Sequence, residues 1–157
     1  MFASKPLVAE FGITRFFGLG DIAGRNLASG WAVPEEKHNW NDGLEASLTL
    51  TISETPTAPC VLSIEARPHL APGLDHQDVT FYFNGYRIGF WRLNHLSGVI
   101  LEAEIEPEFW LTRGSGAFAR CNWHLPDSVR PSEVTSIRDD RQLGLCFQSM
   151  TLTRPRR

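Results

Sequence analysis

The sequence lacks several features that would place it in a common functional class. Only two lysines and three cysteines occur among its 157 residues. No apolar stretch approaches the roughly 18 residues that a membrane-spanning helix needs. We therefore expect no membrane span.

The cysteines are too few and too widely spaced to form the disulfide framework of a small secreted protein. Cys60, Cys121 and Cys146 are an odd number, and no two lie close together in the sequence. Cysteines in such an arrangement are typical of reduced, buried thiols. This pattern predicts a cytoplasmic protein without disulfides.

The charge distribution argues against a nucleic-acid partner. The formal net charge is -3, and the basic residues are scattered apart from the C-terminal Arg154, Arg156 and Arg157. Nucleic-acid binding depends on clustered Lys and Arg that neutralise phosphates. We therefore expect no nucleic acid among the partners.

The motifs of common enzyme classes are also missing. The sequence has no G-x-S-x-G nucleophile elbow, no P-loop and no G-x-G-x-x-G segment. Glu102 and Glu104 have the spacing of a carboxylate pair on one strand, but alternating Glu is also how the wet face of a strand is written. Cys121 and His124 stand three apart on a strand candidate and so face opposite sides. We expect no enzyme, no catalytic residues and no metal ligands.

The dominant pattern is a period of two, in which apolar and polar residues alternate. It recurs, with turn residues between the segments, in the ranges 44–52, 61–66, 79–83, 86–91, 98–105, 117–123 and 143–152. Asn84-Gly85 between two aromatic, β-branched runs is a strong hairpin signal. No long helical pattern occurs, although residues 107–113 favour a short helical turn. The sequence predicts an all-β fold, an antiparallel β-sandwich of about eight strands, as one domain over residues 1–157.

One loop has the composition of a sugar-binding site. Residues 30–43 contain Trp31 and Trp40 in a polar, turn-rich stretch, together with Glu35 and Asp42. An indole face can pack against the C–H face of a sugar, and carboxylates can accept hydrogen bonds from its hydroxyls. Either ring could instead fill the end of the sandwich core, and the residues alone leave both interpretations open.

A second polar stretch raises the question of a metal ion. Asp75, His76 and Asp78 follow a Pro72-Gly73 turn, where such residues commonly serve turn geometry. We interpret them as structural and expect no cofactor. A structural calcium ion bound by loop oxygens stays compatible with the sequence, because such sites also use backbone carbonyls.

Three segments share their order along the chain with a known family. They are residues 30–43 with Gly30-Trp31, Pro34-Glu35 and Trp40-x-Asp42-Gly43; residues 70–85 with a proline-rich turn and the Asn-Gly hairpin; and residues 125–145 with Leu125-Pro126-Asp127 and Asp140-Arg141. Together they resemble small modules found C-terminal to bacterial glycosyltransferases and other exopolysaccharide-related proteins. The resemblance implies a jelly-roll sandwich of the galactose-binding type. It departs from the family at Ala32, where Ser is usual, and at His38, where Gly is usual.

Two hypotheses follow from the residues and the resemblance. The first is a non-catalytic carbohydrate-binding accessory module, linked to bacterial polysaccharide synthesis or export. Its partners would be an oligosaccharide or polysaccharide and a glycosyltransferase or another biosynthesis protein. Its ligand-binding residues would be Trp31, Glu35, Trp40, Asp42, Asp140 and Arg141. Asp140 and Arg141 could instead form an ion pair that anchors the last loop.

The second hypothesis is a protein-interaction module. Its surface would be an exposed aromatic hairpin face that carries Tyr82, Tyr86 and Trp91.

Overall fold

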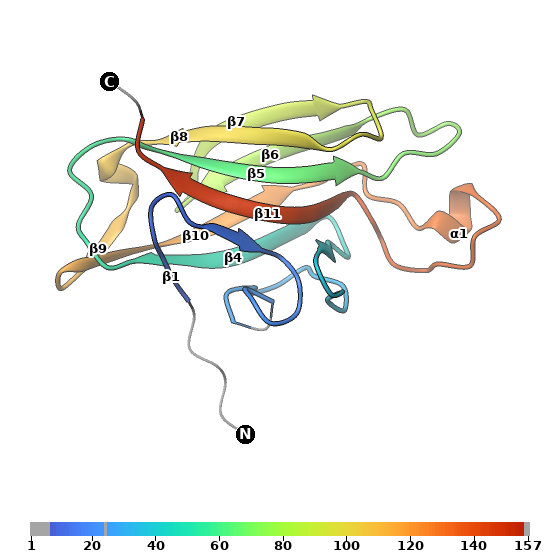
Figure 1. Ribbon diagram of the computed structural model, residues 1–157. Helices are drawn as coiled ribbons and strands as arrows, with labels where there is room; N and C mark the ends of the chain where they lie inside the picture. The colour runs from blue at the N-terminus through green and yellow to red at the C-terminus, as the bar shows by residue number, and fades with distance from the viewer. Residues whose placement is uncertain (1–6, 24, 156–157) are drawn as a thin grey trace.

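The computed structural model describes residues 7–23 and 25–155, so Arg156 and Arg157 of the basic tail lie outside it. Figure 1 shows an elongated sandwich of strands with one short helix at one end. The elements are β1 (Val8–Ala9), β2 (Thr14–Phe16), β3 (Asn39–Trp40), β4 (Glu45–Ile52), β5 (Cys60–Pro68), β6 (Gln77–Phe83), β7 (Tyr86–Leu93), β8 (Val99–Ile105), a 3-10 helix (Pro107–Phe109), β9 (Leu111–Arg113), β10 (Gly116–His124), α1 (Pro131–Val134) and β11 (Leu145–Thr153).

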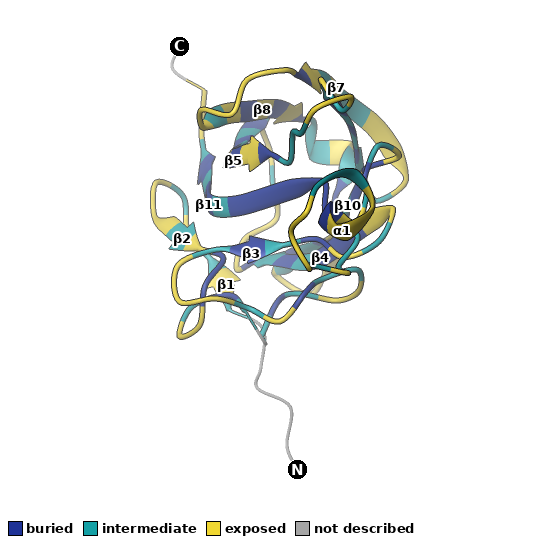
Figure 2. Ribbon diagram, turned by 90° about the vertical axis from the view of Figure 1, so that its right-hand side faces the viewer, coloured by how far each residue is buried: buried dark blue, intermediate teal, exposed yellow. Residues whose placement is uncertain are grey.

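The strands form two sheets. Sheet A has the order β1-β4-β10-β6-β7, with β9 also paired to β10, and sheet B has the order β2-β11-β5-β8, with β3 also paired to β11. Figure 2 looks along the strands and shows the two sheets facing each other, with buried segments between them. The pairs are antiparallel except that β1 runs parallel to β4. The expectation of an antiparallel β-sandwich with little helix is therefore confirmed.

The alternating pattern of the sequence produces this core directly. In β4 the side chains of Ala46, Leu48, Leu50 and Ile52 are buried, as alternation on a pleated strand requires. The rings of Phe81 and Trp123, both in sheet A, stack with centroids 4.9 Å apart. Trp123 also meets Phe147 of sheet B edge-on, at 5.1 Å between centroids. Aromatic contact therefore joins the two sheets.

The structure has more strands than the sequence pattern predicts. Eleven occur among the described residues. Those without a counterpart in the pattern are β1, β2, β3 and β9, each two or three residues long. Two or three residues cannot display a period of two, so these edge segments leave no pattern to read. The expected helical turn at 107–113 is a 3-10 turn over Pro107–Phe109 followed by β9.

The Asn-Gly hairpin forms as expected. Asn84 has φ of 48° and Gly85 has φ of 85°, the two positive values that a type I′ turn needs. The Asn84 side chain also binds backbone groups of two neighbouring segments of the protein. Its Oδ1 accepts from the Arg120 backbone N–H at 2.8 Å, and its Nδ2 donates to the Phe109 carbonyl at 2.9 Å.

We expect Gly85→Val to lower the free energy of unfolding by about 1 kcal/mol or more, because a β-branched residue resists positive φ. Nothing lies within 4 Å of a Cβ placed at Gly85, so the cost comes from the backbone alone. Chemical denaturation of both proteins measures it. Gly85→Asn is the matched control and should cost less, since Asn tolerates this conformation. Equal stability of all three proteins would contradict the prediction.

Candidate functional site

Of the two tryptophans in the 30–43 loop, Trp31 is half-buried and packs against the core. Its indole N–H donates to the Ser47 carbonyl at 2.7 Å. Its ring lies 5.7 Å from Phe17 and 4.8 Å from Phe147, measured between centroids. Both of those neighbours are fully buried. These contacts favour the alternative, in which Trp31 packs at the end of the sandwich, because its indole N–H is already used by the protein.

Asn41, which is not among the predicted site residues, fixes the geometry of this loop. It is fully buried. Its Oδ1 accepts from the backbone N–H groups of Gly144 and Leu145 at 2.9 and 2.8 Å. Its Nδ2 donates to the Gly43 carbonyl and to Ser128 Oγ. The alternation around Trp40 was the signal that could have found it, because neighbours on a strand face opposite sides.

Trp40 lies on the outward side of β3 and is half-buried. It pairs with Cys146 of β11, and its ring meets His69 edge-on at 6.3 Å between centroids. Its indole N–H is not buried and donates to no other residue that the structure describes. Both rings are half-buried, but the indole donor of Trp40 is open, whereas that of Trp31 is used by the Ser47 carbonyl.

Three charged candidates gather near Trp40. Glu35 is exposed and pairs with His38. Asp42 is exposed, and its Oδ1 accepts from the Gln142 backbone N–H at 2.8 Å. The pKa of Arg141 is raised above its usual value, chiefly by its hydrogen bond to Asp139, and the charges of Glu35 and Asp42 add to the effect. Arg141 therefore lies near Glu35 and Asp42, and the charges of Glu35 and Arg141 also reach Cys146, which pairs with Trp40. We refer to Trp40, Glu35, Asp42 and Arg141 as the Trp40 cluster.

Asp140 is not part of this group, and the expected Asp140–Arg141 ion pair is wrong. Arg141 pairs with Asp139 instead, with Nη2 2.7 Å from Oδ2. Asp140 points elsewhere and accepts a hydrogen bond from Ser132 Oγ at 2.6 Å, which holds the α1 loop. The Arg141 guanidinium holds the pKa of the Asp139 carboxyl below its usual range. The last loop is thus anchored as the alternative proposed, but by a different carboxylate.

His76, Asp78 and Asp127 form the group of side chains in the described structure that could hold a metal ion. Their ligand atoms lie within 4.8 Å of one another. However, both Asp78 oxygens accept hydrogen bonds from Arg92, and Asp127 Oδ2 accepts from the Asp78 backbone N–H at 2.7 Å. The Arg92 hydrogen bonds also hold the pKa of Asp78 below its usual value. Calcium prefers six to eight oxygen ligands, so a histidine and two engaged carboxylates do not fit it.

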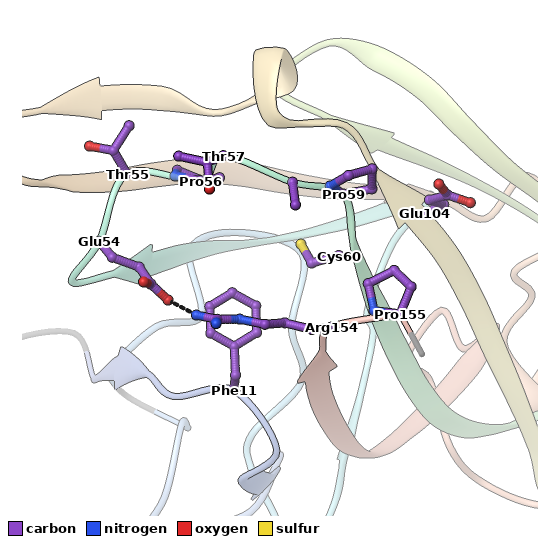
Figure 3. Close-up of a pocket in the computed structure, with 11 residues that line it drawn as sticks. Phe11, Glu54, Thr55, Pro56, Thr57, Pro59, Cys60, Glu104, Arg154 and Pro155 are labelled. Carbon is purple, nitrogen blue, oxygen red and sulfur yellow. Dashed lines mark hydrogen bonds and ion pairs between the residues drawn. The ribbon is translucent and has the colours of Figure 1, made fainter. Parts of the chain in front are cut away.

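A cavity of about 550 Å³ opens at the opposite end of the sandwich from the Trp40 cluster. Figure 3 shows residues 55–59 along one side, Arg154 with Phe11 along the other, and Cys60 between them. Arg154 pairs with Glu54 and lies 4.4 Å above the Phe11 ring centroid. Two of the charged groups of the cavity therefore bind each other, and Glu104 is the third charged residue that lines it.

The aromatic residues of the hairpin do not share one exposed face, contrary to the interaction-module hypothesis. Trp91 packs against the core, and a Cβ on Gly89 would lie 2.2 Å from its ring. Tyr86 stacks on Phe109 at 4.3 Å between centroids. Tyr82 contacts His124 on the outer face of sheet A, and Phe90, which the sequence analysis did not name, is 51% exposed. The hairpin thus exposes Tyr86 and Phe90, while Tyr82 and Trp91 are half-buried.

Glu102 and Glu104 are both exposed on β8, next to buried Leu101, Ala103 and Ile105. They occupy the wet face of the strand, as alternation predicts. All three cysteines are free and buried. No helix of the described residues is long and apolar enough to cross a membrane.

We expect calcium not to stabilise the protein through His76, Asp78 and Asp127, because both carboxylate oxygens of Asp78 already accept hydrogen bonds from Arg92. Thermal melting in calcium and in chelator should give the same Tm. A site occupied at a hundredfold excess over its Kd would add about 2.7 kcal/mol and raise Tm by roughly 5–10 °C. Such a rise, removed by Asp127→Asn, would overturn the prediction.

The buried thiols should react slowly. Burial raises the pKa of Cys60 to about 11, although the nearby Trp110 indole and the Arg154 charge partly offset it. Burial also raises the pKa values of Cys121 and Cys146. Because the thiolate is the reactive form, a thiol reagent at pH 8 should find almost no fast-reacting cysteine in the folded protein and three after unfolding. One fast thiol in the folded protein would contradict this.

Comparison with protein-family models finds no match, and comparison with curated proteins finds no similar sequence. Solved structures do share the fold. The CBM22-1 xylan-binding domain of Xyn10C from Paenibacillus barcinonensis is 12% identical with a TM-score of 0.53, over 98% of this chain and 100% of that one. A GH115 4-O-methyl-α-glucuronidase with specificity for decorated arabinogalactans is 10% identical with a TM-score of 0.50, and the match covers 78% of this chain.

The match spans only 15% of that glucuronidase chain. A CBM36 module in complex with calcium and xylotriose is 7% identical with a TM-score of 0.47, over 90% of this chain and 99% of that one. At these identities the likeness concerns the fold. The fold is a jelly-roll β-sandwich, and its structural neighbours include carbohydrate-binding modules.

Proposed function

We propose that this chain is a non-catalytic carbohydrate-binding module and that the Trp40 cluster is its site. The observation that carries the proposal is the unused indole donor of Trp40 on an outward-facing, half-buried ring. Its ring is partly open and its indole N–H is unused, at an end of a sandwich that resembles a xylan-binding domain. A half-open indole on a rigid strand is a platform on which a sugar ring can stack.

The groups around Trp40 supply the polar part of such a site. Glu35 and Asp42 offer exposed carboxylate oxygens to hydroxyl donors, and Arg141 offers N–H donors to ring and hydroxyl oxygens. The loop that carries them is fixed, because Asn41 and Asp42 bond to the backbone of residues 142–145. A fixed loop loses little conformational freedom when a ligand binds. Trp31 and Asp140 are left out of the proposed site.

The finer role rests on the family resemblance of residues 30–43, 70–85 and 125–145. We propose that the module serves bacterial polysaccharide synthesis or export as an accessory to a glycosyltransferase or another biosynthesis protein. The buried, unpaired cysteines support a reducing, cytoplasmic location. The absence of enzyme motifs in the sequence supports a binding role rather than catalysis.

We expect Trp40→Ala to weaken glycan binding about thirtyfold, which corresponds to about 2 kcal/mol for a central aromatic residue. Its Tm should change little, because the ring is half-buried at a strand edge. A glycan array identifies the ligand, and calorimetry with that ligand measures the affinity of both proteins.

Trp31 provides the matched control. Trp31→Ala should lower the free energy of unfolding by roughly 3–5 kcal/mol, because it empties a core position. Trp31→Phe should keep most of the packing and leave glycan affinity unchanged. The proposed site is wrong if Trp40→Ala leaves affinity intact, or if it destabilises the fold as much as Trp31→Ala does.

A further inference from the structure

The outer face of sheet A carries a set of side chains that the Trp40 cluster does not use. The strand register aligns them in two rows across β4, β10, β6 and β7. One row is Glu45, His124, Thr80 and Phe90, which strand spacing makes roughly 14 Å wide. The next row is Asn122, Tyr82 and Arg87, because Ser47 at its β4 end is fully buried. We call the outward side chains of Tyr82, Arg87, Phe90, Arg120 and His124 the arginine face.

Aromatic rings form the middle of this face. The rings of Tyr82 and His124 lie 4.7 Å apart between centroids. Phe90 is 51% exposed, and the Arg87 guanidinium carbon lies 5.9 Å from its centroid. These rings are on the side of the sheet away from the core, so burial between the sheets does not account for them. They present apolar surface beside cationic groups.

The cations of this face are only partly neutralised. Arg92 pairs with Asp78, and His124 lies 3.5 Å from Glu45. Among the described residues, Arg87 and Arg120 form no ion pair with a carboxylate, although Arg120 Nη2 donates to Ser47 Oγ at 3.2 Å. Both are exposed. Two guanidinium groups thus flank Tyr82 with donors available for an anion.

The opposite outer face has the reverse character. On sheet B the exposed charged positions of β5 and β8 are Glu65, Arg67, Glu102 and Glu104, which carry a net negative charge. The net charge of the chain is -3. Free cationic groups on the arginine face therefore stand out against an acidic molecule, which favours an anionic ligand at this face by charge complementarity.

We propose that the arginine face binds an acidic polysaccharide, that is, a glycan chain that carries carboxylate groups. This inference rests on the proposed carbohydrate-binding role but uses a surface separate from the Trp40 cluster. Arg87 and Arg120 bind carboxylates of the chain through charge-assisted hydrogen bonds. Tyr82 and Phe90 pack against sugar C–H faces, and Asn122 and Thr80 bond to hydroxyls.

A nucleic acid is the other polyanion that an arginine and aromatic surface could take. Glu45 and Asp78 lie on the same face of the sheet and would repel closely spaced phosphates. A glycan presents many neutral hydroxyls between its charges, which suits a face of mixed sign. The observations therefore favour the acidic glycan, and the nucleic acid becomes an arm of the test.

The experiment compares an oligogalacturonate with its methyl-esterified counterpart, which has the same sugar chain without the charge. Calorimetry with the whole chain should show binding of the acid that weakens with added salt, and clearly weaker binding of the ester. Arg87→Gln should lower affinity for the acid about tenfold, as expected for a lost charge-assisted hydrogen bond. Arg87→Gln with Arg120→Gln should lower it further. Arg138→Gln removes the same charge from an exposed loop and should have no effect.

Several results would overturn the inference. They are absence of binding to the acid, equal binding of acid and ester, an Arg87→Gln affinity equal to that of Arg138→Gln, or tighter binding of a single-stranded DNA oligonucleotide than of the acid. Thermal melting checks that each variant is folded, and Arg87→Gln alone decides if Arg120→Gln disturbs Ser47. Trp40→Ala separates the two proposals. This variant should still bind oligogalacturonate at the arginine face. If it binds no glycan at all, the Trp40 cluster remains the proposed site and the arginine face is rejected.

Discussion

The fold depends on a chain of aromatic contacts that passes from one sheet to the other. Phe81 stacks on Trp123 within sheet A, Trp123 meets Phe147 of sheet B, and Phe147 meets Trp31 from the loop. Aromatic side chains bury large apolar areas, so these contacts contribute strongly to the packing between the sheets. The sheet pairing and the path of the 30–43 loop are therefore fixed by one packing unit. The loop that carries the proposed site is held by the same core that holds the sheets.

This shared core explains how much of the fold could be predicted from the sequence. A pleated strand imposes a period of two, so alternating residues predict β4, β6, β7 and β8. The Asn84-Gly85 pair predicts a turn, because that turn needs positive φ. The order of the strands within each sheet could not be predicted from the sequence. It depends on which strands meet across long stretches of chain, and alternation is the same for any partner.

The candidate site could be predicted only in part, because the roles of its residues are decided by distant neighbours. Trp31 and Trp40 look alike in the sequence, yet only Trp31 has Phe17 and Phe147 around it. Asn41 is indispensable to the loop through Gly144, which lies 103 residues further along. A Cβ on Gly144 would come 2.4 Å from Ser128 Oγ, so this close approach also requires glycine. Local composition predicts the loop, but it does not predict which of its residues pack against the core and which face outward.

Trp40 and Arg154 mark opposite ends of the sandwich. Trp40 pairs with Cys146 near the start of β11, and Arg154 follows the end of the same strand, so the two lie at opposite poles of the sandwich (Figure 1). Anything tethered through residue 155, whether a solid support or another folded unit, would sit about one strand length from the indole. The Trp40 pole would then face outward, away from the anchor, and stay accessible to long polymers that are too bulky to enter a crowded junction.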